Sequence, residues 1–500
     1  MDPTAPERRL LYALVFVVGA ASLGAEIAAA RLLAPYFGAS TIVWANTIGV
    51  VLVALSVGYW LGGRYADRHA HMRGLCLLVL VAAALIALIP FASRPFLSFS
   101  VDAFAEISVG GFLGSLFGVL VLVAIPVMLL GAAAPWAIRI TLREVQHSGE
   151  VAGRLYALST AGSLFGTMAS ALVLIPFAGT QRTFLAFALA LALVATAGLG
   201  GRYLVAPLLL VGAIAMPVGT IKGADTGRVL FEAETEHQYV RVVEQADGDR
   251  LLELNEGQAV HSLLRPGSYL TGDVWDGYLV LPFAAGERPP RRIAMLGNAA
   301  GTVTRAYGRF FPRTGVDAVE IDAELFEIGR RYFDLDNPRM REFAEDARPW
   351  LARVDGGYDA IMVDAYRQPY IPFYLATKEF FELARERLAP GGVVIVNAGH
   401  PEGNDDLEAA LGRTMAEVFP TVLRHPIEPT NTLLLGSEAP ISAARLRAAE
   451  PSLPAELRSI AAAAAARLEP RLPGGEVYTD DRAPVEWLID ASLLGYARGN

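Results

Sequence analysis

The first 220 residues are almost free of charge, and this feature limits what the chain can fold into more than any other. They contain 12 Arg, no Lys and 8 Asp or Glu, whereas the whole chain has 42 Lys+Arg and 51 Asp+Glu. A helix that crosses a bilayer needs about 20 mostly apolar residues, and a charge at its centre costs roughly 2.5 to 3.5 kcal/mol. The sequence therefore predicts a multi-span α-helical membrane domain over residues 1–222, with about seven helices at 10–33, 41–62, 75–92, 110–131, 155–178, 183–200 and 203–219.

Two charges interrupt the first of these spans. Glu26 and Arg31 lie five residues apart, a spacing that does not favour a direct ion pair along a helix. Charges at membrane depth usually face a cavity or each other, so the pair indicates either a polar cavity or a buried charge with Arg31 extended to the surface. A cleaved signal peptide is disfavoured, because the run is too long and further spans follow. The fifth span carries small residues from Ser159 to Gly166, which are typical of close helix packing.

The arginines outside the spans predict an orientation. Positive residues gather in alternate loops, which should lie on the cytoplasmic side. The arginines in these loops are Arg8, Arg9, Arg64, Arg68, Arg73, Arg139, Arg143, Arg154 and Arg202. Seven spans would then put the C-terminal domain outside, whereas a nucleotide-like donor is made inside the cell. Either the span count is wrong by one or the domain is external, and the sequence leaves this open.

Residues 221–500 have the opposite character, with 30 Lys+Arg and 43 Asp+Glu. An acidic domain lacks the basic footprint of general nucleic-acid binding, so no nucleic-acid partner is expected. The single cysteine, Cys76, excludes an intrachain disulfide, and the seven His are scattered without ligand spacing. We therefore expect no metal site.

The polar half reads first as short strands and then as alternating strands and helices. Val240, Val242, Leu252 and Leu254 alternate with polar residues around an Asp247-Gly248-Asp249 turn, which predicts a β-hairpin subdomain over 223–288. Strands at 292–296, 316–322, 358–364 and 393–397 alternate with helices, which predicts a parallel, doubly wound sheet in a Rossmann-like domain of the methyltransferase type over 289–440. Residues 441–500 are expected to form a helical tail.

Polar residues follow the predicted strands where ligands bind in such sheets. A glycine-rich turn runs from Gly297 to Gly301, and Glu320 follows about 20 residues later, where an acidic side chain can bind ribose hydroxyls. Asp346 is placed to accept from an adenine amino group. For each carboxylate, including Asp322 and Asp364, the alternative is a helix N-cap or a solvated loop.

In these motifs the chain resembles the spermidine synthases, which are polyamine aminopropyltransferases. The segments that carry the resemblance are Thr235–Val242 with Gln238 as a nucleoside contact, Leu254–Gln258, Val319–Asp322, Glu345-Asp346-Ala347 at the adenine and Val363–Tyr366 with Asp364 as the general base. The spans with Glu26 and Arg31, the segment Gly62–Arg68 and the late segment Tyr478–Glu486 resemble the membrane-fused branch of that family. The resemblance thus extends to most of the chain.

The resemblance implies a reaction and a set of binding residues. An amine would attack the aminopropyl carbon of decarboxylated S-adenosylmethionine, and 5′-methylthioadenosine would leave. Asp364 would be catalytic, and the donor would be a co-substrate, with no permanently bound cofactor. The donor would contact Gln238, Gly297, Asn298, Ala299, Gly301, Glu320, Asp322, Asp346 and Ala347, and the amine would contact Trp275, Asp276, Tyr366 and Arg367.

Several positions depart from the family pattern, mostly on the amine side. Ala299 stands where an aspartate holds the donor's terminal amine, and Arg367 stands where a second aspartate holds the acceptor. Val274-Trp275-Asp276 replaces a tyrosine–histidine–glutamate run. An arginine repels a diamine and suits a carboxylate or phosphate, so the nucleoside side keeps the pattern better than the amine side.

The leading interpretation is a membrane-anchored aminopropyltransferase. A first alternative is an enzyme that uses S-adenosylmethionine itself, as a methyltransferase or a sulfonium lyase acting on a carboxylate-bearing substrate. A second is a transporter or receptor whose soluble domain only binds its ligand. The expected partners are a small amine, a sulfonium nucleoside and the lipid bilayer of the cell membrane, and a homodimer is allowed.

Overall fold

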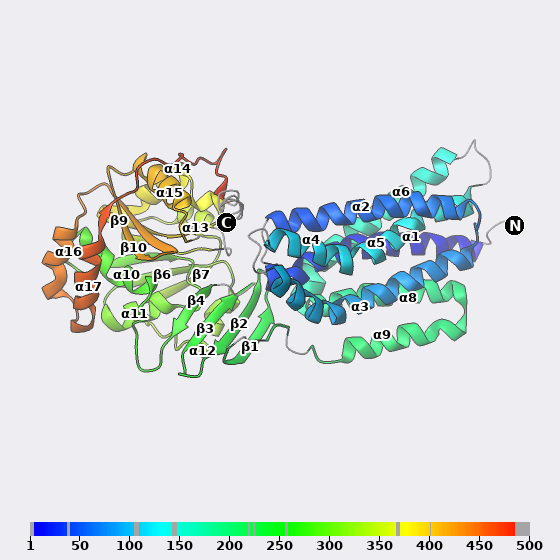
Figure 1. Cartoon of the computed structure of the whole chain (residues 1–500), viewed down its shortest axis with the longest axis horizontal. Coiled ribbons are helices and arrows are strands. Elements are labelled where there is room, and N and C mark those ends of the chain that lie inside the picture. The colour runs from blue at the N-terminus through cyan, green and yellow to red at the C-terminus, as the bar shows by residue number, and fades with distance from the viewer. Residues whose placement is uncertain are drawn as a thin grey trace. The chain divides into compact units, whose positions relative to one another are not determined.

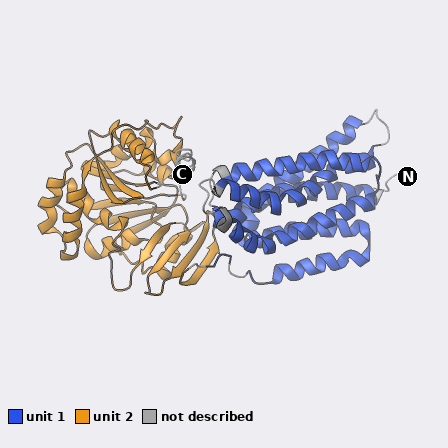
Figure 2. Ribbon diagram, viewed as in Figure 1, with its two compact units in different colours: residues 1–223 blue, residues 224–500 orange. Residues whose placement is uncertain are grey.

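The chain divides into two compact units, residues 1–223 and 224–500 (Figure 2). The computed structural model describes residues 5–37, 41–104, 110–142, 148–218, 221–223, 226–255, 259–366, 371–400 and 402–485. The first unit is helical, and the second is an α/β unit with two sheets (Figure 1). The predicted fold class, a helical domain followed by a Rossmann-like domain with a small β subdomain, is confirmed.

Unit 1 is built from long apolar helices that lie side by side with their axes roughly parallel (Figure 1). Among the described residues, six helices are long and apolar enough to cross a membrane. The elements of unit 1 are α1 (Ala5–Phe37), α2 (Thr41–Ala66), α3 (Met72–Phe104), α4 (Gly110–Leu122), α5 (Ala124–Thr141), α6 (Ser148–Ala169), the π-helical turn η2 (Ser170–Leu174), α7 (Ile175–Ala178), α8 (Thr180–Leu199), the 3-10 turn η3 (Gly201–Leu204) and α9 (Val205–Ala215).

Two of the seven predicted spans need correction. The fourth, 110–131, is interrupted at Val123 between α4 and α5, and the helix then continues to Thr141. Pro126 explains the interruption, because it has no N–H to offer the carbonyl of Leu122 four residues earlier. The seventh, 203–219, is shorter than predicted and is not among these six, because η3 and α9 end at Ala215 and reach only about 22 Å.

The small residues of the fifth predicted span pack α6 directly against α1. A side chain at Gly162 would collide with the carbonyl oxygen of Phe16, and one at Gly166 with that of Ala20. The hydroxyl of Ser163 donates to the carbonyl of Gly19 at 3.2 Å. The prediction of close helix packing is confirmed, and the reason is that glycine lets two backbones touch.

Unit 2 contains a four-stranded antiparallel sheet and an eight-stranded mixed sheet. Its strands are β1 (Arg228–Glu234), β2 (Tyr239–Glu244), β3 (Arg250–Leu254), β4 (Val260–Leu264), β5 (Arg292–Leu296), β6 (Gly315–Glu320), β7 (Met340–Ala344), β8 (Tyr358–Val363), β9 (Leu388–Gly399), β10 (Thr421–Glu428), β11 (Asn431–Ser437) and β12 (Glu469–Pro470). Its helices are α10 (Val274–Val280), η4 (Leu281–Ala284), α11 (Thr302–Phe310), α12 (Glu324–Tyr332), α13 (Ala347–Arg353), η5 (Phe373–Leu375), α14 (Lys378–Arg387), α15 (Asp406–Ala416), α16 (Ala443–Ala449), η6 (Glu450–Ser452) and α17 (Ala455–Arg467).

The large sheet has the order β12-β10-β11-β9-β8-β5-β6-β7. Strands β5 to β9 pair in parallel, and β10, β11 and β12 pair antiparallel. The sheet is therefore mixed, and the expectation of a wholly parallel sheet was wrong at this edge. Five parallel strands that end in an antiparallel hairpin give the order of the methyltransferase-type sheet, as predicted. The expected helical tail contains α16 and α17 and also β12, a short strand at the sheet's edge.

Helices cover both faces of the large sheet. One face packs α10, α11, α16 and α17 over side chains such as Ile293, Met362 and Ile395, and the other packs α13, α14 and α15 over Leu296, Val363 and Val396 (Figure 1). The small sheet packs Val240, Val242 and Leu252 against α12 and Ala300, next to the glycine-rich turn. Both sheets therefore contact the segment that follows β5.

Candidate functional site

The polar residues of the predicted crevice follow neighbouring parallel strands. The glycine turn follows β5, Glu320 ends β6, Asp364 follows β8 and Asn397 lies near the end of β9. Parallel strands place their carboxyl ends at one edge of the sheet, where ligands bind in such folds. The backbone N–H of Asp364 donates to the carbonyl of Leu296 at 2.8 Å, which joins the ends of β5 and β8.

The glycine turn is held by backbone hydrogen bonds and by one strict steric requirement. Gly297 has φ 86°, and a side chain there would collide with the backbone of Asp364 and Ala365. The N–H groups of Gly297 and Asn298 donate to the carbonyl of Val319 at 2.9 and 3.1 Å. Only glycine allows the two strand ends to approach this closely.

A cavity of about 560 Å³ opens beside this turn. It brings together six of the predicted site residues, namely Trp275, Gly297, Asn298, Ala299, Asp364 and Tyr366. The cavity is not lined by seven others, which are Gln238, Asp276, Gly301, Glu320, Asp322, Asp346 and Ala347. The last predicted residue, Arg367, lies outside the described residues.

Asp364 is the candidate base, and its surroundings raise its pKa to about 6. Burial is the main cause, because it disfavours the charged carboxylate, and nearby Asp273 adds to the rise. Hydrogen bonds from Asn397 and Trp275 act in the opposite direction. The amide of Asn397 donates to Oδ1 of Asp364 at 2.9 Å, and the amide of Asn431 donates to Oδ1 of Asn397 at 3.0 Å. This series of hydrogen bonds fixes the orientation of the carboxylate.

The hydroxyl of Tyr366 is used inside the fold. It donates to the carbonyl of Asn397 at 2.8 Å and accepts from the N–H of Gly399. Burial raises the pKa of this phenol far above its ordinary value, so it stays neutral. Tyr366 therefore forms part of the cavity wall and holds β9 against the loop after β8.

Glu320 and Asp322, the residues expected at the ribose, do not line the cavity. Glu320 bonds to the glycine turn instead. Glu320 accepts from the N–H of Ala299 at 2.8 Å and from that of Asp322 at 3.2 Å, and burial raises its pKa to about 7. Asp322 accepts from Thr235 at 2.6 Å and from Gln238 at 3.3 Å. These bonds tie the small sheet to the large one beside the glycine turn.

Asp346, expected at the adenine, lines a second hollow of about 490 Å³ with Arg348 and Tyr374. It caps α13 by accepting from the N–H of Arg348 at 3.0 Å, and the hydroxyl of Tyr374 donates to it at 2.7 Å. Arg348 in turn binds both carboxylate oxygens of Asp480, from the late segment, at 2.7 and 2.6 Å. The N-cap alternative therefore describes the bonding of Asp346 in this structure.

Asp276, expected to contact the amine, bonds instead to the loop that precedes α10. Its carboxylate accepts from the N–H and hydroxyl of Thr271 at 2.9 and 3.0 Å and from the N–H of Gly272 at 2.8 Å. Asp273, one helical turn earlier, lines the cavity instead and caps α10 by accepting from the N–H of Val274. A substrate contact by Asp276 has no support in this geometry.

Other cavity residues were missed from the sequence, among them His261, Asp273, Asn397, Glu428 and Asn431. Asn397 had a usable signal, because it ends an apolar strand just as Asp364 does. Glu428 had none, since it ends a hairpin strand that was not predicted.

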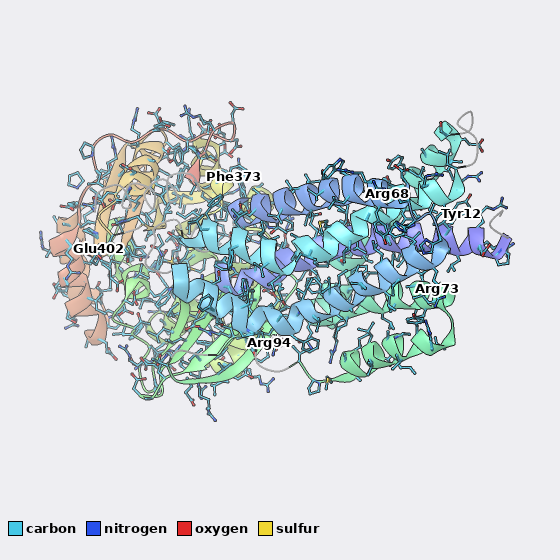
Figure 3. The ribbon with its side chains drawn as sticks, turned by 45° about the vertical axis from the view of Figure 1, so that its right-hand side comes forward. Tyr12, Arg68, Arg73, Arg94, Phe373 and Glu402 are labelled. Atoms are coloured by element: carbon cyan, nitrogen blue, oxygen red, sulfur yellow. The ribbon has the colours of Figure 1, made fainter. Side chains whose placement is uncertain are left out.

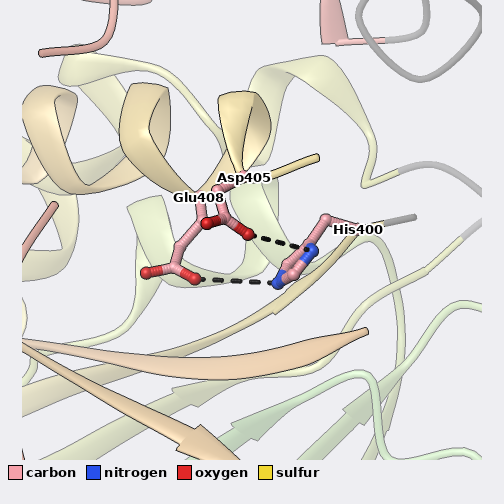
Figure 4. A group of neighbouring side chains, drawn as sticks. All are labelled: His400, Asp405 and Glu408. Carbon is pink, nitrogen blue, oxygen red and sulfur yellow. Dashed lines mark ion pairs between the residues drawn. The ribbon is translucent and has the colours of Figure 1, made fainter. Parts of the chain in front are cut away.

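His400 also lines the cavity and forms a group with Asp405 and Glu408 (Figure 4). The ring nitrogens lie 3.8 Å from Asp405 and 3.6 Å from Glu408. Both oxygens of Glu408 already accept from Arg424, at 2.5 and 3.0 Å. The guanidinium disfavours a metal cation there, because it places a positive charge on the same carboxylate.

Residues 281–437 match the family described as "Spermine/spermidine synthase domain". Over this segment the chain is similar to the spermidine synthases. A "Probable polyamine aminopropyl transferase" of Bifidobacterium longum is 34% identical over 190 residues, which are 38% of this chain and 42% of the relative. The "Polyamine aminopropyltransferase 2" of Pseudomonas aeruginosa is 31% identical over 206 residues, 39% and 56% of the two chains. The chain thus covers about half the length of these curated relatives.

A solved structure, that of a probable spermidine synthase from Corynebacterium glutamicum, aligns with 50% of this chain and 98% of its own, at 22% identity and a TM-score of 0.38. The spermidine synthase of Thermotoga maritima aligns with 44% of this chain and 78% of its own, at 17% identity and a TM-score of 0.36. The matched family domain begins in η4 and ends with β11, so it contains the glycine turn, Glu320 and Asp364.

Proposed function

We propose that unit 2 is an aminopropyltransferase that uses a decarboxylated S-adenosylmethionine-type donor and an amine acceptor and releases 5′-methylthioadenosine. The observation that carries the proposal is the position of Asp364, whose carboxylate lies in one cavity with the glycine turn and has a pKa raised to about 6. A base whose pKa lies near the working pH can accept a proton during the reaction. The family domain and the names of the curated relatives support the same reaction.

The chemical step is a substitution at carbon. The neutral amine nitrogen attacks the aminopropyl carbon next to the sulfonium, the N–C bond forms, and the C–S bond breaks with its electron pair going to sulfur. The amine's proton goes to the carboxylate of Asp364. The sulfonium is already a good leaving group, so positioning and exclusion of water supply most of the acceleration.

The donor's nucleoside is proposed to lie along the glycine turn, with Glu320 at the ribose, Gln238 and Asp322 beside it and Asp346 at the adenine. In this structure Glu320 accepts from the N–H of Ala299. Ribose hydroxyls would donate to the same carboxylate beside this N–H, since a carboxylate can accept several hydrogen bonds. Tyr374 would turn away from Asp346 to admit the adenine amino group.

The proposal is tested with the purified full-length chain, incubated with an amine and with either decarboxylated or intact S-adenosylmethionine. Mass spectrometry of the products should find 5′-methylthioadenosine and an amine longer by one aminopropyl group, only with the decarboxylated donor. S-adenosylhomocysteine would identify a methyltransferase instead. Binding of either donor without turnover would support the receptor alternative, and no binding of either would refute the nucleoside site.

We further propose that unit 1 anchors the enzyme in a membrane. Arginines cluster at one end of its helices, where Arg139 pairs with Asp67 at 3.4 Å and Arg154 bonds the hydroxyl of Tyr12 at 3.2 Å. Tyr12, Arg68 and Arg73 lie toward this end in Figure 3, and Arg94 lies away from it. The positive-inside rule assigns the arginine-rich end to the cytoplasm.

The chain leaves unit 1 far from the arginine-rich end. The hydroxyl of Tyr36, at the end of α1, donates to the carbonyl of Ile221 at 3.1 Å, and Tyr36 lies about 36 Å along the helix from Tyr12. This contact favours a seventh, short crossing by α9 and a catalytic unit outside the cytoplasm. The donor and the amine would then have to reach that side.

Single cysteines test this arrangement in a Cys76→Ala background. Thr226→Cys and Ala70→Cys both place an exposed thiol in a loop. In intact cells, a thiol reagent that does not cross membranes should label position 226 and leave position 70 unlabelled. Labelling at neither position in intact cells would put both of them, and with them the catalytic unit, in the cytoplasm and reduce the crossings to six.

A further inference from the structure

The late segment of the chain, residues 478–485, packs beside the residues proposed at the adenine, although it lies beyond the matched family domain of residues 281–437. Tyr478 is fully buried in the core that packs α13, α14 and α15. Its backbone N–H donates to the hydroxyl of Thr414 at 3.0 Å, and its carbonyl accepts from the N–H of Lys378 at 2.8 Å. These contacts fix the segment on unit 2.

Asp480 lies at the turn of this segment and joins the starts of two helices. Its carboxylate accepts from both terminal nitrogens of Arg348 at 2.7 and 2.6 Å and from the hydroxyl of Thr377 at 2.7 Å. Its backbone N–H donates to the carboxylate of Glu379 at 3.0 Å. Arg348 belongs to the first turn of α13 and Thr377 caps α14, so one carboxylate ties these two helices together.

Arg348 connects Asp480 to Asp346, the residue proposed at the adenine. The backbone N–H of Arg348 donates to Oδ1 of Asp346 at 3.0 Å, and its guanidinium donates to the carbonyl of Tyr374 at 3.0 Å. The hydroxyl of Tyr374 donates to Oδ2 of Asp346 at 2.7 Å. Asp480 therefore binds the arginine that holds both Asp346 and the backbone of Tyr374.

This arrangement meets a requirement of the proposed nucleoside site. The hydroxyl of Tyr374 has to leave Asp346 when an adenine amino group binds, whereas its backbone carbonyl can stay on Arg348. A two-point ion pair restricts the orientation of an arginine side chain more than a single contact does. The hydrogen bond from Arg348 also lowers the pKa of Asp480, so this carboxylate stays charged at neutral pH.

We propose that Asp480 is a positioning residue for recognition of the donor's adenine, because through Arg348 it keeps the carboxylate of Asp346 directed at the amino group of the base. This inference rests on the proposed function, in which Asp346 binds the adenine. Asp480 lines neither hollow, so it acts without touching the donor or the amine. Its loss should weaken selection of the base and leave the chemistry at Asp364 unchanged.

The test compares two nucleosides that differ only in the base, 5′-methylthioadenosine and 5′-methylthioinosine, by calorimetric titration of the full-length protein. The inosine base carries a carbonyl oxygen where adenine carries its amino group. The wild type should prefer the adenine nucleoside roughly 10- to 100-fold, because only adenine donates to the charged Asp346 there. In Asp480→Asn this preference should fall about three- to tenfold, since the ion pair is partly exposed.

A purely structural role for Asp480 would change other quantities. It would lower the melting temperature and weaken the binding of both nucleosides alike, so an unchanged preference for adenine in Asp480→Asn would overturn the inference. Asp481→Asn, at the neighbouring exposed acid, is the matched control and should keep the wild-type preference. In turnover, Asp480→Asn should raise the KM for the donor about three- to tenfold and leave kcat and the KM for the amine unchanged.

The connection through Arg348 is tested by a double variant. Arg348→Gln should reduce the preference at least as much as Asp480→Asn does. The double variant should reduce it no further than Arg348→Gln alone, because both changes break the same contact. Losses that multiply in the double variant would contradict an action through Arg348.

The titrations need no turnover, so they separate this inference from the proposed function. If neither donor form yields a lengthened amine, aminopropyl transfer is refuted, and the two titrations still decide on Asp480. A wild type that binds the two nucleosides equally, or binds neither, rejects the inference.

Discussion

The two sides of the candidate site are built in different ways. On the nucleoside side, the glycine turn, Glu320 and Asp322 use their polar groups on one another: Ala299 donates to Glu320, and Gln238 donates to Asp322. On the amine side, Asp273 and Glu428 come from the distant elements α10 and β10, and His261 has no side-chain partner. The first side is fixed before a ligand arrives, whereas the second leaves groups available for one.

This difference assigns separate roles to the two sides. A preformed backbone turn recognises a constant group, since its shape depends on steric fit more than on particular side chains. The open acids of the amine side select the acceptor, since their charge decides which cation or anion can enter. Substitutions on the two sides should therefore alter different kinetic constants.

Asp364 joins the two sides, and its loss should have the largest effect. Asp364→Asn should lower kcat roughly 10²- to 10⁴-fold, because an amide cannot accept the amine's proton. Donor binding, measured by calorimetry, should persist. Asp355→Asn, an exposed aspartate outside the cavity, serves as the matched control. Near-normal kcat in Asp364→Asn would remove the carboxylate from the mechanism.

The steric basis of the nucleoside side is tested by Gly297→Ala. The added methyl group would collide with the backbone of Asp364 at a positive φ, so the unfolding free energy of unit 2 should fall by about 3 kcal/mol or more, with loss of donor binding. Gly357→Ala is the control, because Gly357 has a similar φ of 81° and open space around it. It should cost only about 1 kcal/mol. Equal melting temperatures for the two variants would contradict the steric argument.

The nucleoside side could largely be predicted from the sequence because its signals are local. A strand, a glycine turn and an acidic residue about 20 positions later lie within one β-α-β unit, and the structure joins them as expected through Val319 and Ala299. β7 was missed because its sequence, Met-Arg-Glu-Phe-Ala, has two charges on a short edge strand. The same locality explains why the helices of unit 1 were placed well except at Pro126 and at the short α9.

The amine side could not be predicted in the same way. Asp273 and Asp276 are three residues apart at the start of one helix, and only the loop from Thr271 decides that Asp276 turns away from the cavity. Glu428 reaches the cavity through the antiparallel hairpin of β10 and β11, whose strand contains Pro426 and lacks a clear alternation. Such pairings depend on contacts between distant segments, which a local pattern does not contain.

The contrast between the two aspartates on α10 can be measured directly. Asp276→Asn should destabilise unit 2 by about 1 to 3 kcal/mol, because the buried N–H groups of Thr271 and Gly272 lose their charged acceptor. Its KM for the amine should be normal. Asp273→Asn should show the reverse, with normal stability and a raised KM. Thermal unfolding and steady-state kinetics on both variants decide the matter, and a raised KM in a stable Asp276→Asn protein would contradict it.

The pH profile tests how the fold tunes Asp364. Its pKa of about 6 means that kcat/KM should fall as the pH drops through 6, because the protonated acid cannot accept a proton. The hydrogen bond from Asn397 lowers this pKa, so Asn397→Ala should move the acid limb to higher pH. Asn404→Ala, outside the cavity, should leave the limb in place. If the acid limb of the pH profile has the same midpoint in Asn397→Ala as in the wild type, a group other than Asp364 is titrating.

The smallest effect is expected at the adenine end. Tyr374→Phe removes a hydroxyl that donates to Asp346 at 2.7 Å, a single hydrogen bond worth about 0.5 to 1.5 kcal/mol. The donor KM should change roughly two- to tenfold and the amine KM should not. Tyr269→Phe, on an exposed tyrosine outside both hollows, is the control. A change confined to the amine KM would reverse the assignment of the two sides.

The most direct test of the account follows the aminopropyl group itself. Decarboxylated S-adenosylmethionine would carry deuterium in its aminopropyl chain and carbon-13 in its methyl group, and the full-length enzyme would be given 1,4-diaminobutane. All the deuterium is expected in the lengthened amine and all the carbon-13 in 5′-methylthioadenosine. Carbon-13 in the amine product, or no transfer of deuterium to it, would contradict the account.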